Sequence, residues 1–271
     1  MAGNSTQWRG RSVTSKVVLL LDAFSPSAPE LSLGELSRRT GLPLSTTYRL
    51  ATELVEWGGL ERGHGGGYRI GLRLWEIGAL APRGESIREL ALPFMNDLYE
   101  ATHENVHLAV REGREALYVE KIRGRRSVNL QSRRGGRLPL HATGSGKVLL
   151  AYAPPGLVDE ILAGRLKRYT PHTVVAPGHL RRELEEVRRT GVAFAREEMT
   201  RGSVSVAAPV HDARGTVVAA LALVVRSARA DLDRLAPATR TASISVSREI
   251  RSRGLVVESP AAVTGTAAAA T

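Results

Sequence analysis

Two histidines and a glutamate in the middle of the chain have the spacing of a zinc-protease motif. His103, Glu104 and His107 fit the pattern His-Glu-x-x-His, whose chemistry requires both imidazoles on one helix and the glutamate as general base beside the metal. The helical pattern ends near Thr102, however, and polar and apolar residues alternate from Asn105 onward. Residues four apart in a strand lie about 13 Å apart, which is too far to share one zinc ion. We therefore interpret this segment as a helix-to-strand junction and expect no metal site.

A second candidate lies at residues 144–147, where Gly-Ser-Gly-Lys is similar to a phosphate-binding loop. The pattern for nucleotide hydrolysis fails twice, because His141 stands at the position of the first glycine and Val148 replaces the magnesium-binding Ser or Thr. Small residues at a helix start still expose backbone N–H groups and the positive end of the helix dipole, which suits an anionic ligand. A simple helix cap after Pro139 is the alternative.

Serine-based catalysis does not fit the pattern around these residues. Ser145 and His141 have the types of a nucleophile and a base, but no Gly-x-Ser-x-Gly elbow surrounds the serine and no acidic partner is placed beside them. The chain contains no cysteine, which excludes disulfides, thiolate metal ligands and cysteine nucleophiles. We expect a protein that is not an enzyme and that uses no cofactor.

The segment 32–57 predicts a helix, a tight turn and a second helix. Ser32 followed by Glu35 predicts a capping box, in which each side chain accepts a hydrogen bond from a backbone N–H at the helix start. Gly41 is expected to end the first helix in a left-handed conformation. Pro43 keeps the preceding residue extended, so the helix cannot continue.

The second helix begins at Leu44 or Ser45, and its apolar positions Leu50, Leu54 and Trp57 predict one inward face. The opposite face is short, polar and rich in hydrogen-bonding groups, which suits the major groove of DNA. It consists of Ser45, Thr46, Arg49, Thr52 and Glu53. The alternative is an ordinary helical hairpin with a solvated outer face.

Residues 58–70 favour the DNA-binding interpretation, because they predict two short strands around a glycine-rich tip. A hairpin directly after a recognition helix is a wing. We expect Arg62, His64 and Arg69 to contact phosphates or the adjacent minor groove.

Three segments in the same order resemble the IclR family of transcriptional regulators. Residues 12–70 are similar to its winged helix-turn-helix, and residues 138–147 (Leu-Pro-Leu-His-Ala-Thr-Gly-Ser-Gly-Lys) and 207–210 (Ala-Ala-Pro-Val) are similar to its effector-domain signatures. The resemblance implies an α+β protein with an N-terminal winged helix-turn-helix, a linker helix and a C-terminal GAF-like effector-binding domain, whose central antiparallel sheet is flanked by helices. It also implies that residues 144–147 line the effector pocket and that the DNA-binding domains pair through the linker.

The resemblance also indicates pocket residues, several of which depart from the family's usual types. Ala195 stands near a common acidic position, Ser205 replaces a common Cys, and Ala222 and Val224 replace a common serine pair. These changes make the expected pocket more apolar, so we expect a hydrophobic or aromatic carboxylic acid rather than a very small oxoacid. The expected effector-binding residues are Gly144, Ser145, Ala195, Glu198, Ser203, Ser205, Ala222 and Val224.

Periodicity divides the rest of the chain into further elements. Helices are expected at 12–24, 71–81, 85–102, 145–152, 158–162, 180–190 and 232–250, and strands at 106–110, 117–122, 128–131, 192–195, 204–210 and 217–225. The expected parts are a flexible arm (1–11, with Arg9 and Arg11 near phosphates), a DNA-binding domain (12–70), a linker and dimerisation helix (71–86), an effector-binding domain (87–250) and a disordered tail (251–271). The linker is apolar on more than one side, so it must pack against a second subunit or within its own chain.

Charge is less informative than motif order. The net charge is +11, but residues 1–83 hold 10 basic and 7 acidic side chains, whereas residues 84–271 hold 28 and 20. The expected DNA-binding part is therefore not the more basic part. No segment approaches eighteen consecutive apolar residues and no secretory signal is recognisable, so we expect a cytoplasmic protein without membrane spans.

Together these features predict a ligand-responsive regulator of transcription, with repression as the commoner mode in the family. It is expected to bind a pseudo-palindromic double-stranded operator as a homodimer or homotetramer, and to release or remodel it on binding a small organic acid. The expected base-reading residues are Thr46, Thr47 and Arg49, with Ser45, Tyr48 and Arg69 nearer the phosphates. The alternative is a small-molecule sensor or enzyme of GAF-like fold without a DNA role, for which no catalytic constellation is present.

Overall fold

The computed structural model describes residues 12–80, 82–124 and 132–257. The expected arm at 1–11 with Arg9 and Arg11, the expected strand at 128–131 and the part of the expected tail after residue 257 lie outside this description. The chain forms two compact units, residues 1–82 and residues 83–271. Each unit is described by itself below.

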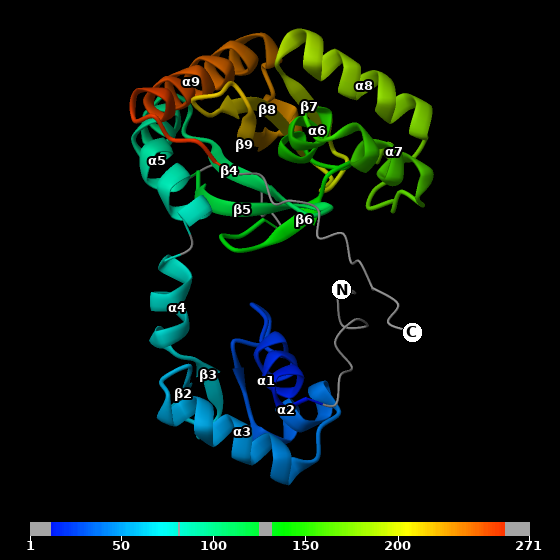
Figure 1. Ribbon diagram of the computed structural model, residues 1–271. Coiled ribbons are helices and arrows are strands. Elements are labelled where there is room, and N and C mark those ends of the chain that lie inside the picture. Colours follow the sequence, from blue (N-terminus) through cyan, green and yellow to red (C-terminus); the bar gives the residue numbers. More distant parts are fainter. Residues whose placement is uncertain (1–11, 81, 125–131, 258–271) are drawn as a thin grey trace, which may run out of the picture. The chain divides into compact units, whose positions relative to one another are not determined.

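The first unit is a helical domain with a small sheet (Figure 1). Its elements are α1 (Val13–Asp22), β1 (Glu30–Leu31), α2 (Leu33–Thr40), α3 (Leu44–Glu56), β2 (Leu60–Arg62), β3 (Tyr68–Ile70) and α4 (Leu72–Ala79). The strands pair antiparallel in the order β1-β3-β2. The expected wing is thus present, and β1 adds a third strand that the sequence did not predict. One hydrophobic core joins the helices to the sheet through Leu20, Leu31, Leu36, Leu50, Leu60 and Tyr68.

The predicted signals around the turn are confirmed. Ser32 and Glu35 form the capping box, since the Ser32 N–H donates to the Glu35 carboxylate at 2.8 Å and the Glu35 N–H donates to Ser32 Oγ at 3.3 Å. Gly41 follows α2 with a φ of 71°, the left-handed conformation that favours glycine. The prediction of the inward face of α3 is correct for Leu50, which is buried, but wrong for Trp57. Trp57 caps the end of the helix and is 46% exposed.

The second unit is a six-stranded antiparallel sheet covered by helices on both faces. Its elements are α5 (Pro82–Thr102), β4 (Asn105–Glu112), β5 (Glu115–Ile122), β6 (Arg137–Pro139), α6 (Gly144–Ala151), α7 (Pro155–Ala163), α8 (Pro177–Thr190), β7 (Ala193–Arg196), β8 (Ser203–His211), β9 (Val217–Arg226), the 3-10 turn η1 (Ser227–Arg229) and α9 (Leu232–Ser252). The strand order is β6-β5-β4-β9-β8-β7. The α+β fold with a central antiparallel sheet is confirmed, and β6 is a strand that the periodicity did not reveal.

The sheet separates two hydrophobic cores, with α5 and α9 on one face and α6, α7 and α8 on the other (Figure 1). Strand β9 shows the division, because its residues alternate between the two cores. Leu221 and Leu223 pack with α5 and α9, whereas Ala220 and Ala222 pack with the α6 side. The α6 face of the middle strands is lined by small alanines, which lets α6 approach the sheet closely.

Two expected boundaries are clarified by the structure. The helical pattern does end at Thr102 and β4 does begin at Asn105, with His103 at a φ of 54° between them. The junction interpretation of the His-Glu-x-x-His segment is therefore confirmed. The start of the expected tail at residue 251 is wrong, because α9 continues to Ser252 and Leu255 then packs on the α5–α9 core.

Candidate functional site

The outer face of α3 presents most of the residues expected to bind DNA. Ser45, Tyr48 and Arg49 are exposed, and Thr46 is half-buried. The expectation that Thr47 reads a base is wrong, because this residue is fully buried. Its hydroxyl donates to the Pro43 carbonyl at 3.0 Å. Such a side chain holds the start of α3 to the turn and cannot reach a base edge.

Two of the arginines expected to bind DNA form ion pairs with neighbouring glutamates, whereas the hydroxyl of Thr52 on α3 is turned away from the surface. Arg49 donates to Glu53 one helical turn away at 3.0 Å, and the Thr52 hydroxyl is buried. Arg69 makes two hydrogen bonds to Glu61, at 2.9 and 3.1 Å.

Arg62 stacks over the Tyr68 ring at 4.0 Å and donates to the Gly66 carbonyl at the wing tip, at 3.1 Å. His64 is exposed at the same tip. Arg62, His64 and Arg69 are therefore all at the surface of the hairpin, where a wing contacts the DNA backbone or minor groove.

The α6 face of the second unit contains a pocket that opens to solvent; the empty space in and in front of it, solvent at the mouth included, is about 450 Å³. Strands β4, β5, β7, β8 and β9, the segment 132–145 and the turn after β7 contribute to it. Its lining residues are His107, Tyr118, Ser132, Leu138, Ala142, Thr143, Ser145, Ala195, Glu198, Met199, Thr200, Ser203, Ser205 and Val224. The wall combines apolar side chains with hydroxyl groups, which is the composition of a site for a small organic molecule.

One end of the pocket is built from uncharged polar groups. Burial, together with the nearby Lys121 charge, lowers the pKa of His107 to about 3, so its imidazole is neutral at physiological pH. Its Nε2 lies 3.3 Å from Ser132 Oγ, and its ring meets the Tyr118 ring edge-on at 5.4 Å between centroids. Burial also raises the pKa of Tyr118, which hydrogen-bonds with hydroxyls of segment 143–145.

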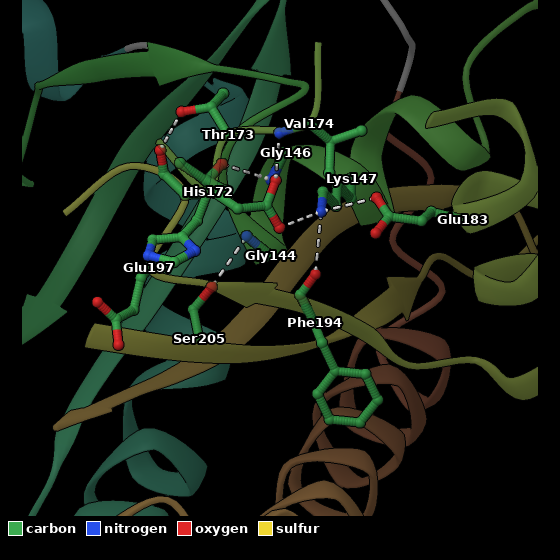
Figure 2. A network of polar contacts seen from close by, with 12 residues as sticks. Gly144, Gly146, Lys147, His172, Thr173, Val174, Glu183, Phe194, Glu197 and Ser205 are labelled. Carbon is green, nitrogen blue, oxygen red and sulfur yellow. Dashed lines mark hydrogen bonds and ion pairs between the residues drawn. The ribbon is translucent and has the colours of Figure 1, made fainter. Parts of the chain in front are cut away.

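The other end of the pocket contains a buried ion-pair network (Figure 2). Lys147 Nζ lies 2.5 Å from Glu198 Oε1 and 2.8 Å from Glu183 Oε2, and it donates to the Phe194 carbonyl at 3.2 Å. Burial raises the pKa of Glu198, and the Lys147 charge opposes that rise. Lys147 does not reach the pocket itself, so its charge serves the network rather than a ligand.

The start of α6 has the features of a helix cap. The Gly144 N–H donates to Ser205 Oγ at 2.9 Å, and the Gly146 N–H donates to Thr143 Oγ1 at 3.0 Å. The first of these hydrogen bonds is drawn as a dashed line in Figure 2. Two donors expected to face an anionic ligand are therefore used by the protein. The alternative of a helix cap after Pro139 is therefore confirmed, and Thr143 is the capping residue.

Comparison with known proteins decides the family. Residues 13–64 match the IclR helix-turn-helix domain, and residues 82–248 match the bacterial transcriptional regulator IclR C-terminal domain. This chain belongs to the IclR family of transcriptional regulators. As a member of this family it is a DNA-binding transcriptional regulator with an effector-binding domain.

Individual relatives agree with this assignment over most of both chains. The HTH-type transcriptional regulator XynR of Escherichia coli strain K12 is 34% identical over 218 residues, covering 80% of this chain and 86% of that protein. The HTH-type transcriptional repressor AllR of Klebsiella pneumoniae is 33% identical over 229 residues, covering 83% and 84%. Both are named as regulators rather than enzymes.

A solved structure extends the similarity to the arrangement of the chain. The crystal structure of an IclR homologue from Microbacterium hydrocarbonoxydans, complexed with 4-hydroxybenzoate, has a TM-score of 0.85 and 33% sequence identity. The match covers 89% of this chain and 100% of that one.

The structure gathers most of the expected effector-binding residues of this IclR-family chain around one pocket. Those that line it are Ser145, Ala195, Glu198, Ser203, Ser205 and Val224. Gly144 lies just behind the wall, bonded to Ser205, and Ala222 is buried in the core beneath α6. Neither residue lines the pocket.

The aromatic end of the pocket, formed by His107 and Tyr118, is not predictable from the sequence pattern alone. The alternation in β4 places Val106, Leu108 and Val110 on one face of the sheet and His107 and Ala109 on the other. That face was not assigned to the pocket because the partner strands were unknown. Tyr118 of β5 was missed for the same reason.

Three further observations concern metal binding, the histidine of the Ser145–His141 pair and membrane spans. Within residues 12–80, 82–124 and 132–257, no group of three or more histidine and acidic side chains is arranged to hold a metal ion. The His141 Nε2 lies 2.9 Å from the Lys167 carbonyl oxygen. In the same described ranges, no helix has the length and apolar character needed to cross a membrane.

Proposed function

We propose that this IclR-family chain is a repressor that releases or remodels its operator when a hydrophobic or aromatic carboxylic acid occupies the pocket of the second unit. The pocket is the observation that carries the proposal, because apolar side chains and buried hydroxyl groups line it together and the described residues around it form no catalytic arrangement. The exposed outer face of α3 supplies the DNA-binding surface in the same chain.

The pocket wall supports an aromatic acid as the effector. Leu138, Met199 and Val224 offer apolar surface to a ring, and the Ser and Thr hydroxyls around them offer hydrogen bonds to polar substituents. The structurally similar Microbacterium protein was crystallised with 4-hydroxybenzoate, a molecule of this class. Repression is proposed because AllR, a relative over most of the chain, is named a repressor.

Helix α4 supports pairing of two chains. Leu72, Trp75, Ile77 and Leu80 are all exposed, and no residue of α4 is buried. Apolar surface of this extent favours burial against another chain. We therefore propose residues 12–70 as the DNA-binding domain, 71–86 as the linker that pairs two chains and 87–250 as the effector-binding domain, in a cytoplasmic protein.

A dimer formed in this way would present two recognition helices, which predicts a pseudo-palindromic operator in double-stranded DNA. Pairing of two such dimers into a tetramer is compatible with the same operator. Among the α3 and wing residues, Thr46 and Arg49 are proposed to read bases. Ser45, Tyr48 and Arg69 are proposed to contact phosphates.

Footprinting tests this function directly. The DNA around the gene that encodes the protein is incubated with the full chain at low salt, with and without a panel of aromatic and aliphatic acids. A protected palindrome that an aromatic acid loosens supports the proposal. Absence of protection by the folded protein would leave a small-molecule sensor without a DNA role.

A further inference from the structure

A carboxylate in the pocket wall is an unexpected group for a site proposed to receive an organic acid. Glu198 lines the pocket and is 5% exposed. Its Oε1 is bound to Lys147, whereas its Oε2 accepts a long hydrogen bond of 3.4 Å from the Val174 N–H. This second oxygen retains capacity for a stronger donor, because a carboxylate oxygen accepts more than one hydrogen bond.

The positive charge beside Glu198 does not offer an alternative site for an effector carboxylate. Lys147 is 1% exposed and is held by Glu183, Glu198 and the Phe194 carbonyl together (Figure 2). One ammonium group thus faces two carboxylates, and this end of the pocket has an excess of acceptors. A carboxylate of the effector would be repelled there, whereas a hydroxyl or amino group could donate a hydrogen bond to the excess acceptors.

The two ends of the pocket are lined by different elements and offer different chemical groups. Tyr118 lies on β5 and Ala195, beside the Glu198 turn, lies on β7. In the strand order β5-β4-β9-β8-β7, these two strands lie on either side of β4, β9 and β8, so Tyr118 and the Glu198 turn approach the pocket from opposite sides. The distant end contains hydroxyls and a neutral imidazole, which can donate hydrogen bonds to a carboxylate without a net charge of their own.

We infer that Glu198 recognises a hydrogen-bond donor, a hydroxyl or an amino group, at the end of the effector opposite its carboxylate. This inference rests on the proposed effector pocket and narrows its ligand to aromatic acids with a donor across the ring from the acid group. Lys147 is a positioning residue in this arrangement, because its ion pair fixes Glu198 Oε1 and leaves Oε2 with only the long hydrogen bond from the Val174 N–H.

A matched ligand series measures this selectivity on the full chain. Isothermal titration with 4-hydroxybenzoate, 4-methoxybenzoate, benzoate and terephthalate compares a donor, a blocked donor, no substituent and a second carboxylate. We expect 4-hydroxybenzoate to bind at least tenfold more tightly than 4-methoxybenzoate or benzoate, since a hydrogen bond to a charged acceptor has this strength. Terephthalate is expected to bind most weakly. Equal affinities for 4-hydroxybenzoate, 4-methoxybenzoate and benzoate would overturn the inference.

Substitution assigns the selectivity to Glu198. Glu198→Gln preserves size but removes the charge, and we expect the preference for 4-hydroxybenzoate over benzoate to fall to threefold or less. Glu183→Gln is the matched control, because Glu183 binds the same Lys147 but does not line the pocket. The control is expected to keep the tenfold preference. A preference that survives in Glu198→Gln, or is lost equally in both variants, would overturn the inference.

Two further readouts separate the failures that matter. Circular dichroism establishes that each variant is folded. If Glu198→Gln does not fold, Glu198→Asp takes its place in the comparison. The aspartate keeps the charge, but its side chain is one methylene shorter, so its carboxylate lies farther from the ligand. If no aromatic acid binds the wild type, the proposed effector class and the inference both fail. If the acids bind without regard to the donor, the effector class stands and only the inference fails.

Discussion

The recognition helix and the effector pocket use their charged groups in opposite ways. On α3 and the wing, Arg49 and Arg69 are exposed and paired with neighbouring glutamates. Each arginine can therefore leave its glutamate and bind a DNA phosphate or base at a small cost in free energy. In the pocket, Lys147 and Glu198 are buried and hold each other in place. The comparison indicates a surface that exchanges partners and a cavity wall that is preorganised, as binding sites of these two kinds require.

The largest effect is expected from breaking the buried network. Lys147→Met leaves Glu183 and Glu198 without their common cation, and removing one partner of a buried ion pair destabilises a protein by about 3–5 kcal/mol. Urea unfolding followed by circular dichroism measures the loss. A change below about 1 kcal/mol would show that the network is not a determinant of stability.

The buried imidazole in the pocket is expected to make stability depend on pH. His107 has a pKa of about 3 in the folded protein and an ordinary value of 6.5 when unfolded. The unfolded chain therefore binds the extra proton between these values, and the stability is complete above pH 6.5 and falls as the pH is lowered. The contribution lost at pH 5 is about 2 kcal/mol.

The test is the difference between the wild type and His107→Gln in unfolding free energy at pH 7 and pH 5. The variant is expected to lose less stability on acidification, although His141 and His211, whose pKa values are also lowered by burial, leave some slope. Parallel pH profiles for the two proteins would contradict the assignment of a buried neutral His107.

The exposed arginines of the DNA-binding surface are tested by measuring operator affinity rather than the free energy of unfolding. Arg49→Ala is expected to weaken specific operator binding by about 1–3 kcal/mol, measured by fluorescence anisotropy with the footprinted operator. Thr47→Val is the matched control on the same helix. Because the Thr47 hydroxyl binds the Pro43 carbonyl, its loss is expected to reduce stability by about 1 kcal/mol and to leave base preference unchanged. An altered base preference in Thr47→Val would restore its base-reading role.

The smallest effect is expected from the exposed pair on α3. Glu53→Gln removes the partner of Arg49, and exposed pairs one helical turn apart contribute about 0.3–0.5 kcal/mol. The change in unfolding free energy should therefore be an order of magnitude below that of Lys147→Met. A loss comparable with that of the buried lysine variant would remove the distinction between the two regions.

The same distinction explains what the sequence could predict. The capping box at Ser32 and Glu35 and the turn at Gly41 depend on residues within ten positions of each other, so their pattern is visible along the chain. The two errors on α3, Thr47 and Trp57, arose because helical spacing alone does not determine which side of a helix end the core covers.

The pocket depends instead on which strands are neighbours. His107 and Val224 are brought to one wall by the pairing of β4 with β9, across more than a hundred residues of sequence. The family resemblance indicates Ser145 and Ser205, whereas Tyr118 of β5 can be placed in the pocket only once the sheet order is known. The ion pairs of Lys147 join α6 to α8 and to the turn after β7, and no local pattern indicates them.

The central claim is that an aromatic acid in the pocket controls the affinity of α3 for DNA. The most direct measurement is the dissociation constant of the full chain for its footprinted operator, determined at fixed salt with increasing 4-hydroxybenzoate and with benzoate as the matched ligand. The account predicts that operator affinity falls as 4-hydroxybenzoate rises, with a smaller effect of benzoate at equal concentration. An operator affinity that is independent of both acids, while calorimetry shows that they bind, would contradict it.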